Sequence, residues 1–454
     1  MYSLSVFATV EYVVKLKENL RYVDVEVCFS GADNETRPRN LLIDRDTPRF
    51  ISKVKWNGSE RRLRGTRLGV PGDVRTGCLE YRARLESGGS RWGGSSSDFV
   101  LTGSKQWLLA PQEGTDAIIR FETPLNYSVS HPWPIATATE IPSDYEWFQL
   151  AQTPASWSNN IAFGRFEIHQ IPVANTFLRM VVLPSQPKMP IKLARAWVIE
   201  SAEAALASHG ALPQREPQVL ITPVGTQNEA IPFARVMRGG GIGLQFFVDQ
   251  SQVQQKYSDD WKPTHEFAHL LLPYISRKDA WLSEGLASYY QNVLRARDGR
   301  LTQNQAWDKL LAGFERGRRG TISKRTLSEE ASGMHRNRSY HRVYWSGAAM
   351  LMLADVRLRI ESGGQKSLDS ALAGLVDCCM QLGKVWTGLE MMQQLDKVSG
   401  VSVFTDVYHR YTRSRDFPKV EDTLRRLGVV ERRGSIFFDE QAPQDKIRRA
   451  IMSK

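Results

Sequence analysis

Two histidines and a glutamate lie close together in the segment His265-Glu266-Phe267-Ala268-His269. On a helix, residues four positions apart share one face a single turn apart, so both imidazole rings can reach one metal ion. Zinc binds such nitrogen atoms at about 2.0–2.1 Å, and catalytic zinc sites leave one coordination position for water. Glu266, next to the first histidine, can take the proton from that water. The segment therefore predicts a zinc site with a general base beside it.

A third protein ligand is expected at Glu284, fifteen positions beyond His269. It lies early in the segment WLSEGLASYY, whose pattern indicates a second amphipathic helix that can turn this carboxylate back towards the metal. The alternative is a carboxylate that only faces solvent and the positive end of its helix. A metzincin would need glycine at position 272 and histidine at 275, where Leu272 and Ile275 stand. We therefore predict that His265, His269 and Glu284 hold one Zn²⁺ ion per chain.

The elements that must position these residues also have their own signals. The first helix can begin after the capping pair Asp259-Asp260, tolerates Pro263 in its first turn and ends before Pro273. The buried face of this helix is expected to consist of Phe267, Leu270 and Leu271. Because the connection from His269 to Glu284 is short, we expect a tight loop between the two helices.

The pattern of apolar and turn residues divides the chain into three predicted domains. Residues 1–183 carry short β-branched and apolar runs, such as Val23–Phe29, separated by turn residues, which suits a β-sandwich-like domain. Residues 184–300 contain a helix at Ile191–His209 and strands near Gln218–Thr222 and Leu244–Val248, which indicates a mixed α/β domain. Residues 301–454 are almost entirely helical in pattern. The predicted fold class is multi-domain α+β with an all-helical C-terminal domain.

Composition excludes several classes of protein. Of 454 residues, 41% are hydrophobic and 24% charged, which is typical of globular and not of disordered chains. No run approaches the roughly 18 apolar residues of a transmembrane span. The net charge of +11 raises the question of nucleic acid, but the basic residues are scattered and no recognisable nucleic-acid module interleaves them with aromatic residues. We expect no nucleic-acid partner and no transmembrane segment, and the oligomeric state stays open.

The cysteines and the N-terminus bear on the cellular compartment. Four cysteines are too few for a disulfide scaffold, although Cys28 can pair with Cys78. The adjacent Cys378 and Cys379 lie in a helical pattern and are expected in the core. Residues 1–15 lack a complete signal peptide, although Val6-Phe7-Ala8 has the small-residue character of a cleavage site. Cytoplasmic and exported, periplasmic locations therefore both fit.

The segments HEFAH and WLSEGLASYY together resemble the gluzincins, the thermolysin-like superfamily of zinc metallopeptidases. The stretch Tyr344–Asp355 and its continuation to Asp369 are most similar to the glycyl aminopeptidase family, as is Val23–Gly31. This resemblance implies an N-terminal β domain, a thermolysin-like catalytic domain and a helical C-terminal domain. It also favours export over a cytoplasmic location.

The resemblance further implies a tyrosine that donates a hydrogen bond to the oxyanion of the reaction, and Tyr344 matches it by position. A phenol aimed at developing negative charge is suitable chemistry, whereas an interior tyrosine that only packs is the alternative. Tyr340 and His341 are nearby substitutes for this role.

The segment Arg238–Gly243 lies where gluzincins place an edge strand that binds the substrate backbone. Aminopeptidases carry a glutamate there for the free amine of the substrate, but this segment has none, and only Glu229 or Asp249 could supply one from outside. An ordinary turn before the next strand is the alternative reading. The residues predicted to let a peptide backbone approach closely are Gly239, Gly240 and Gly241.

The predicted function is hydrolysis of peptide bonds in a peptide or protein substrate, as an aminopeptidase or an endopeptidase. Zinc would polarise the carbonyl and acidify water, Glu266 would act as general base, and Tyr344 would stabilise the oxyanion. The alternatives are a pseudo-peptidase that binds peptides without cutting them, and a zinc hydrolase of a non-peptide bond.

Overall fold

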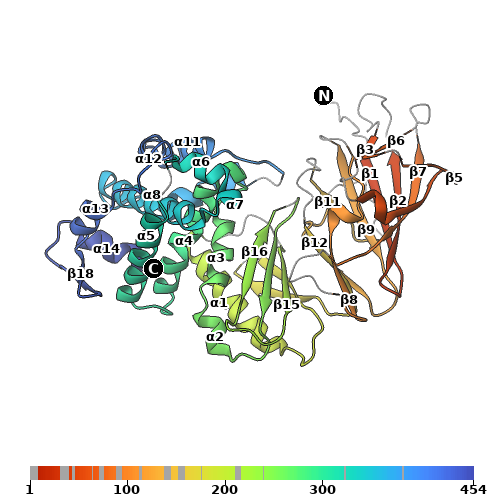
Figure 1. Ribbon diagram of the computed structural model, residues 1–454, viewed down its shortest axis with the longest axis horizontal. Helices are drawn as coiled ribbons and strands as arrows, with labels where there is room; N and C mark the ends of the chain where they lie inside the picture. Colours follow the sequence, from red (N-terminus) through yellow and green to blue (C-terminus); the bar gives the residue numbers. More distant parts are fainter. Residues whose placement is uncertain are drawn as a thin grey trace. The chain divides into compact units, whose positions relative to one another are not determined.

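The computed structural model describes residues 9–30, 40–42, 47–63, 65–70, 76–87, 95–111, 115–136, 145–151, 159–174, 176–209, 216–238, 240–321, 324–380 and 383–453. The chain forms two compact units (Figure 1). The first unit consists of Met1–Pro172, Phe177–Ala194 and Gln214–Ser251, and the second of Val173–Thr176, Arg195–Pro213 and Gln252–Lys454. The three predicted ranges 1–183, 184–300 and 301–454 stay a prediction about domain boundaries.

A seven-stranded sheet is the main element of the first unit. Its strands run in the order β11-β9-β1-β2-β7-β4-β5. In β2, Val23, Val25 and Val27 are buried while the acidic residues between them are half-buried, which is the alternation of a strand with one covered face. The bounds are β1 (Thr9–Leu16), β2 (Tyr22–Ser30), β4 (Ile51–Trp56), β5 (Ser59–Glu60), β7 (Gly77–Arg84), β9 (Asp116–Glu122) and β11 (Phe148–Leu150).

A second, three-stranded sheet packs into the same core. It has the order β10-β12-β8, formed by Ser128–Ser130, Asn160–Gly164 and Phe99–Gly103. Phe163 of this sheet belongs to one apolar cluster with Val25 of the first sheet and with Trp107. Two sheets that share a core in this way confirm the predicted β-rich N-terminal domain. Smaller elements nearby are the strand pair β3 (Asn40–Leu42) and β6 (Arg67–Gly69) and the 3-10 turns η1 (Thr47–Phe50) and η2 (Ser104–Gln106).

A five-stranded mixed sheet follows, in the order β13-β14-β15-β17-β16. Strands β14, β15 and β17 are parallel, and β17 is buried along its whole length, as parallel strands commonly are. Helix α1 has the predicted bounds Ile191–His209. The strands are β13 (His169–Val173), β14 (Thr176–Val182), β15 (Gln218–Pro223), β16 (Phe233–Met237) and β17 (Gly243–Val248).

The edge strand of this sheet is β16, which pairs antiparallel with β17. The expectation that the glycine segment itself forms the edge is therefore wrong, because Gly240 and Gly241 lie in the connection from β16 to β17. Gly239 lies outside the described residues.

The second unit is mainly helical. It includes most of α1, and from residue 252 onward its elements are α2 (Gln254–Asp259), α3 (Lys262–Ala268), η4 (His269–Leu271), η5 (Arg277–Asp279), α4 (Ala280–Arg297), α5 (Gln303–Arg319), α6 (Leu327–Ser332), α7 (Met334–Asn337), α8 (Tyr340–Glu361), α9 (Leu368–Ala373), α10 (Val376–Cys379), α11 (Gly388–Ser399), α12 (Val403–Tyr411), α13 (Glu421–Arg426), β18 (Val429–Arg432), β19 (Ser435–Phe438) and α14 (Asp445–Met452). No helix in the described part of the chain is long and apolar enough to cross a membrane.

The helical C-terminal region is confirmed, but it is not all-helical because β18 and β19 form a hairpin. The two residues of its loop, Arg433 and Gly434, have φ of 51° and 76°, the left-handed pair that a tight two-residue hairpin needs. The helical pattern expected around Cys378 and Cys379 forms the short helix α10, which is separated from α9 by a break at Gly374.

Helices α4 and α8 lie side by side (Figure 1) and contact each other at glycine residues. A Cβ atom on Gly285 of α4 would overlap the backbone of Gly347 in α8, and one on Gly347 would overlap the Trp281 carbonyl oxygen. The two backbones therefore approach more closely than any larger residue allows. Glu284 stands next to one of these glycines and Tyr344 lies one helical turn before the other, so this contact positions both.

The predicted Cys28–Cys78 pair forms a disulfide between opposite residues of β2 and β7. Cys378 and Cys379 also form a disulfide, with each other. Cys379 is buried, but Cys378 is exposed, so the prediction that both lie in the core is wrong for Cys378. The possible cleavage site at Val6–Ala8 lies outside the described residues.

Candidate metal centre

The two histidines of the HEFAH segment lie one turn apart at the end of α3. His265 is inside the helix and His269 begins the 3-10 turn η4. Their ring centroids are 4.9 Å apart with the rings nearly perpendicular, and the exposed fractions of the two side chains are only 4% and 5%. The buried side of the helix also includes Phe267, as predicted.

Glu284, in the second turn of α4, brings the third donor atom. Its Oε2 lies 3.4 Å from His265 Nε2 and 3.6 Å from His269 Nε2. One ligand atom from each of the three residues lies within 4.8 Å of the other two. The structure therefore brings the three predicted ligands together at one point, from two elements separated in sequence by a short connection.

Two side chains that we did not predict hold the other nitrogen of each histidine. His265 Nδ1 lies 2.8 Å from Gln291 Oε1, and His269 Nδ1 lies 3.0 Å from Ser283 Oγ. The Gln291 oxygen can only accept, so His265 Nδ1 carries a proton, and Nε2 is the nitrogen that faces Glu284 and is placed to bind a metal. Gln291 stands two helical turns after Glu284, a spacing that places both on one face and could have identified it.

Burial and neighbouring charges have opposite effects on the pKa values of His265 and Glu284. Burial lowers the pKa of His265, but Glu284, Glu266 and Gln291 raise it by more, so the net shift is upward. Burial raises the pKa of Glu284, whereas His269, His265 and Tyr344 lower it by more, so this carboxylate is ionised. An anionic oxygen beside two imidazole nitrogens is a donor set that zinc accepts, and three protein ligands leave room for a fourth.

Glu266 and Tyr344 lie beside the three ligands. Glu266 is 7% exposed and is close enough to raise the pKa of both His265 and Tyr344. The Tyr344 hydroxyl is hydrogen-bonded to Glu284, and its ring stacks on the His265 ring at a centroid distance of 6.3 Å. Burial, followed by Glu284 and Glu266, raises the pKa of Tyr344, so the phenol keeps its proton.

The substitutes for Tyr344 lie further out. Tyr340 is 38% exposed, contacts the Tyr344 ring edge-on at 6.4 Å, and shares a 3.1 Å hydrogen bond with His335. His341 is exposed. Tyr344 is therefore the phenol that the structure places next to the ligands.

The predicted glycine site belongs to the other unit and has a local explanation. Gly240 has a φ of 81°, which favours glycine, and a Cβ on Gly241 would overlap the carbonyl group of Pro132. Asp249, considered as a partner for a substrate amine, accepts hydrogen bonds from the Gln227 backbone and from Ser251 within its own turn.

A partly buried ionic network links the helices that carry the ligands to their neighbours. Asp369 accepts two 2.9 Å hydrogen bonds from Arg297 of α4 and one of 2.6 Å from Tyr290. Asp355 of α8 accepts one from Tyr289 of α4 at 3.2 Å. Because these carboxylates are satisfied by charged or phenolic donors from α4, they fix this helix relative to α8 and α9.

No protein-family model and no curated protein sequence matches the chain. Several solved structures do match the chain in fold. An aminopeptidase N family protein from Idiomarina loihiensis superposes with a TM-score of 0.68 and 12% identity, covering 93% of this chain and 78% of its own. An M1 zinc metallopeptidase from Deinococcus radiodurans gives 0.54 and 16%, covering 91% and 94%. Yeast LTA4 hydrolase gives 0.55 and 13%, covering 93% and 71%.

One further match is a mutant of the Deinococcus radiodurans M1 zinc metallopeptidase bound to a Tyr-Ser-Ala substrate, with a TM-score of 0.56 and 15% identity over 91% and 94% of the two chains. At these identities the comparisons establish fold. The nearer likeness to glycyl aminopeptidases stays a prediction. With its β-rich N-terminal part, mixed α/β middle and helical C-terminal region, this chain has the same fold as these aminopeptidase N family and M1 zinc metallopeptidase structures.

Proposed function

We propose that the chain is a zinc-dependent peptidase in which His265, His269 and Glu284 hold one Zn²⁺ ion. The observation that supports this best is the convergence of two Nε2 atoms and one carboxylate oxygen at 3.4 and 3.6 Å, with both Nδ1 atoms already occupied by Gln291 and Ser283. Outer partners of this kind orient imidazoles for a metal. The names of the structural neighbours, several of which are zinc metallopeptidases, point the same way.

The proposed mechanism assigns a task to each neighbouring side chain. Zinc bound to these ligands would lower the pKa of a water molecule and polarise the carbonyl group of the substrate. Glu266 accepts the proton of the attacking water and returns it to the leaving nitrogen. Tyr344, protonated because burial and two carboxylates raise its pKa, donates a hydrogen bond to the developing oxyanion.

Metal analysis followed by digestion of a peptide library tests the proposal. His269→Ala should lose zinc, whereas Glu266→Gln should keep zinc and lose turnover. His409→Ala, at an exposed histidine of α12, is the control and should keep both. Full zinc occupancy in the double variant His265→Ala, His269→Ala would contradict the ligand assignment. A zinc-loaded wild type that cleaves no peptide would favour a pseudo-peptidase or a hydrolase of another bond.

We also propose that a free amine on the substrate is not strictly required. Burying a protonated amine without a carboxylate partner is costly, and the Asp249 carboxylate already accepts hydrogen bonds from the Gln227 backbone and from Ser251. Matched peptides with free and acetylated N-termini test this. Cleavage of both is expected. If acetylation abolishes cleavage while the free peptide is trimmed one residue at a time, the chain is an aminopeptidase and this proposal is wrong.

A further inference from the structure

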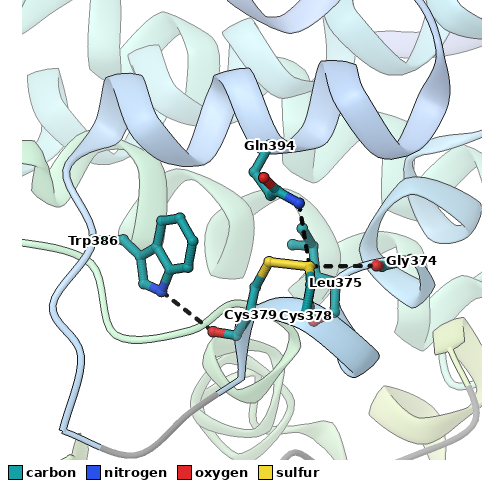
Figure 2. The surroundings of a disulfide bond; sticks show 6 residues. All are labelled: Gly374, Leu375, Cys378, Cys379, Trp386 and Gln394. Carbon is teal, nitrogen blue, oxygen red and sulfur yellow. Dashed lines mark hydrogen bonds between the residues drawn. A yellow bond between two sulfur atoms is a disulfide. The ribbon is translucent and has the colours of Figure 1, made fainter.

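The disulfide between Cys378 and Cys379 has no evident role in stability (Figure 2). A disulfide stabilises a fold chiefly by restricting the unfolded chain, and its effect grows with the length of the loop that it closes. Cys28 and Cys78 are separated by 50 positions, whereas Cys378 and Cys379 are neighbours and enclose no loop. The second bond therefore needs another explanation.

One cysteine of this pair is exposed and the other is buried. Cys378 is exposed, while Cys379 is only 1% exposed. Cys378 Sγ accepts a hydrogen bond from Gln394 Nε2 at 3.3 Å and lies 3.7 Å from the carbonyl oxygens of Gly374 and Leu375. A thiol from solution can therefore attack Cys378, with Cys379 as the leaving group.

The two redox states differ in their hydrogen bonds. A disulfide sulfur carries no proton and cannot donate to the carbonyls of Gly374 and Leu375, but a Cys378 thiol can. Reduction also opens the small covalent ring that the disulfide closes. This ring restrains the peptide group between the two cysteines, which consists of the Cys378 carbonyl and the Cys379 amide. Reduction therefore changes both the covalent restraint and the hydrogen bonds on the backbone at the end of α10.

This backbone is hydrogen-bonded to the connection between the metal ligands. The Cys379 carbonyl accepts a buried 3.2 Å hydrogen bond from Trp386 Nε1 (Figure 2). The Trp386 backbone in turn donates to the Tyr274 carbonyl at 2.8 Å and accepts from the Ser276 amide at 2.7 Å. Tyr274 and Ser276 lie between η4, which carries His269, and α4, which carries Glu284.

The residues next to Trp386 also contact the start of α4. A Cβ atom on Gly388 would lie 2.9 Å from Asp279 Oδ1 and 3.0 Å from the Trp281 ring, so the backbone packs directly on both. Trp281 Nε1 donates to Asp279 Oδ1 at 3.3 Å, and the Asp279 amide donates to the Ser276 carbonyl at 2.8 Å. A shift of Trp386 is therefore transmitted to the turn that precedes Glu284.

We propose that Cys378 and Cys379 are a redox-sensitive modification site that tunes the affinity of the metal centre through Trp386. The proposal rests on the proposed function, because it assumes that the centre binds zinc. The reductant is a dithiol, either a small molecule or a protein.

The chemistry is thiol–disulfide exchange. A thiolate of the reductant attacks Cys378 Sγ, the bond to Cys379 breaks, and Cys379 leaves as a thiolate that takes up a proton. The second thiolate of the reductant then attacks the reductant's sulfur atom in the mixed disulfide, and Cys378 leaves as a thiolate that takes up a proton. Two electrons and two protons pass to the protein, and the reductant leaves as a disulfide.

The test uses the full chain, reduced with dithiothreitol and then freed of it by anaerobic gel filtration. Alkylation with mass spectrometry should find Cys378 and Cys379 reduced while Cys28 and Cys78 stay bonded. Competition with a chromophoric chelator should give a zinc dissociation constant about tenfold weaker after reduction, the lower end of the usual effect of an outer-shell change. Amide hydrogen exchange at Ser276 and Trp386 should become faster on reduction even without metal.

Two variants separate the possible causes. The double variant Cys378→Ser, Cys379→Ser should show the weaker affinity before and after treatment. Trp386→Phe, which keeps an aromatic ring but loses the indole N–H, should not respond to reduction. Equal zinc affinity and equal exchange in the two states of the wild type would overturn the proposal, as would an unchanged response in Trp386→Phe. Wild type that binds no zinc in either state, yet shows the change in exchange, would refute the proposed function and support the redox site.

Discussion

Replacing Gln291 with leucine should weaken zinc binding without removing any ligand. Gln291 Oε1 accepts the hydrogen bond from His265 Nδ1 at 2.8 Å, and both side chains are buried, so no bulk water replaces the lost acceptor. A buried donor left without a partner costs about 1–3 kcal/mol. Without metal the imidazole avoids this cost by moving its proton to Nε2, which blocks the nitrogen that the metal needs.

Binding must then reverse the tautomer and leave Nδ1–H unsatisfied. The dissociation constant should therefore rise by a factor of roughly 5 to 150, which overlaps the 10–100-fold range usual for outer-shell partners of zinc ligands. Gln291→Glu keeps an acceptor and should bind zinc at least as tightly as the wild type. Ser283→Ala should have a smaller effect, because Ser283 is only partly buried and water can replace its hydroxyl.

Competition with a chromophoric chelator at constant pH measures these constants. Gln393→Leu, at an exposed glutamine of α11, is the matched control and should leave them unchanged. Thermal unfolding of the metal-free variants checks that each one folds. If folded Gln291→Leu binds zinc as tightly as the wild type, the argument that Gln291 sets the tautomer of His265 is refuted.

Three further predictions concern other parts of the molecule. Gly347→Ala should destabilise the protein by about 3 kcal/mol or more in urea unfolding, because its Cβ would overlap the backbone of α4, whereas Gly103→Ala, whose Cβ meets nothing within 4 Å, should change little. Tyr344→Phe should lower kcat by about 10²–10³ and leave KM nearly unchanged; an unaltered kcat would make Tyr344 a packing residue. The hydrogen bond from Arg82 is the main cause that lowers the pKa of Asp24 from 3.8 to about 2. The stabilisation of the fold by this ion pair is therefore complete above pH 4 and is lost as the pH falls towards 2. Because the pair is partly exposed, Asp24→Asn should cost about 1 kcal/mol at pH 7 and almost nothing at pH 2 in urea unfolding; an equal cost at both pH values would exclude the ion pair as its source.

Much of the candidate site was predictable because it is encoded in local spacing. His265 and His269 lie one helical turn apart in any α-helix, and proline and capping signals place that helix at this point in the chain. Glu284 follows from the same logic, since it lies early in an amphipathic helix after a short connection. Helix α1 and the buried strands β15 and β17 were predictable for a related reason, because continuous or periodic apolar runs report burial directly.

What local spacing could not determine depends on contacts between segments that are distant in sequence. Gln291 reads as an ordinary helical residue until α3 packs against α4 and brings His265 to it. The role of Gly347 becomes clear only from the contact between α8 and α4. Strand β16 is the edge of the mixed sheet because it pairs with β17, and this pairing could not be predicted from local spacing.

The cysteines show the same division. Pairing of Cys28 with Cys78 was open to prediction from two cysteines in one β domain, but their alignment depends on the register of β2 against β7. The prediction of a helix around Cys378 is confirmed, but the prediction that Cys378 is buried is wrong. The break at Gly374 makes α10 a separate turn with one side at the surface, and the local pattern does not show this break. The side chains that can do chemistry, and the elements on which they lie, were predictable because they depend on neighbours within a few residues. The groups that orient and surround them were not, because those contacts form only when whole elements pack.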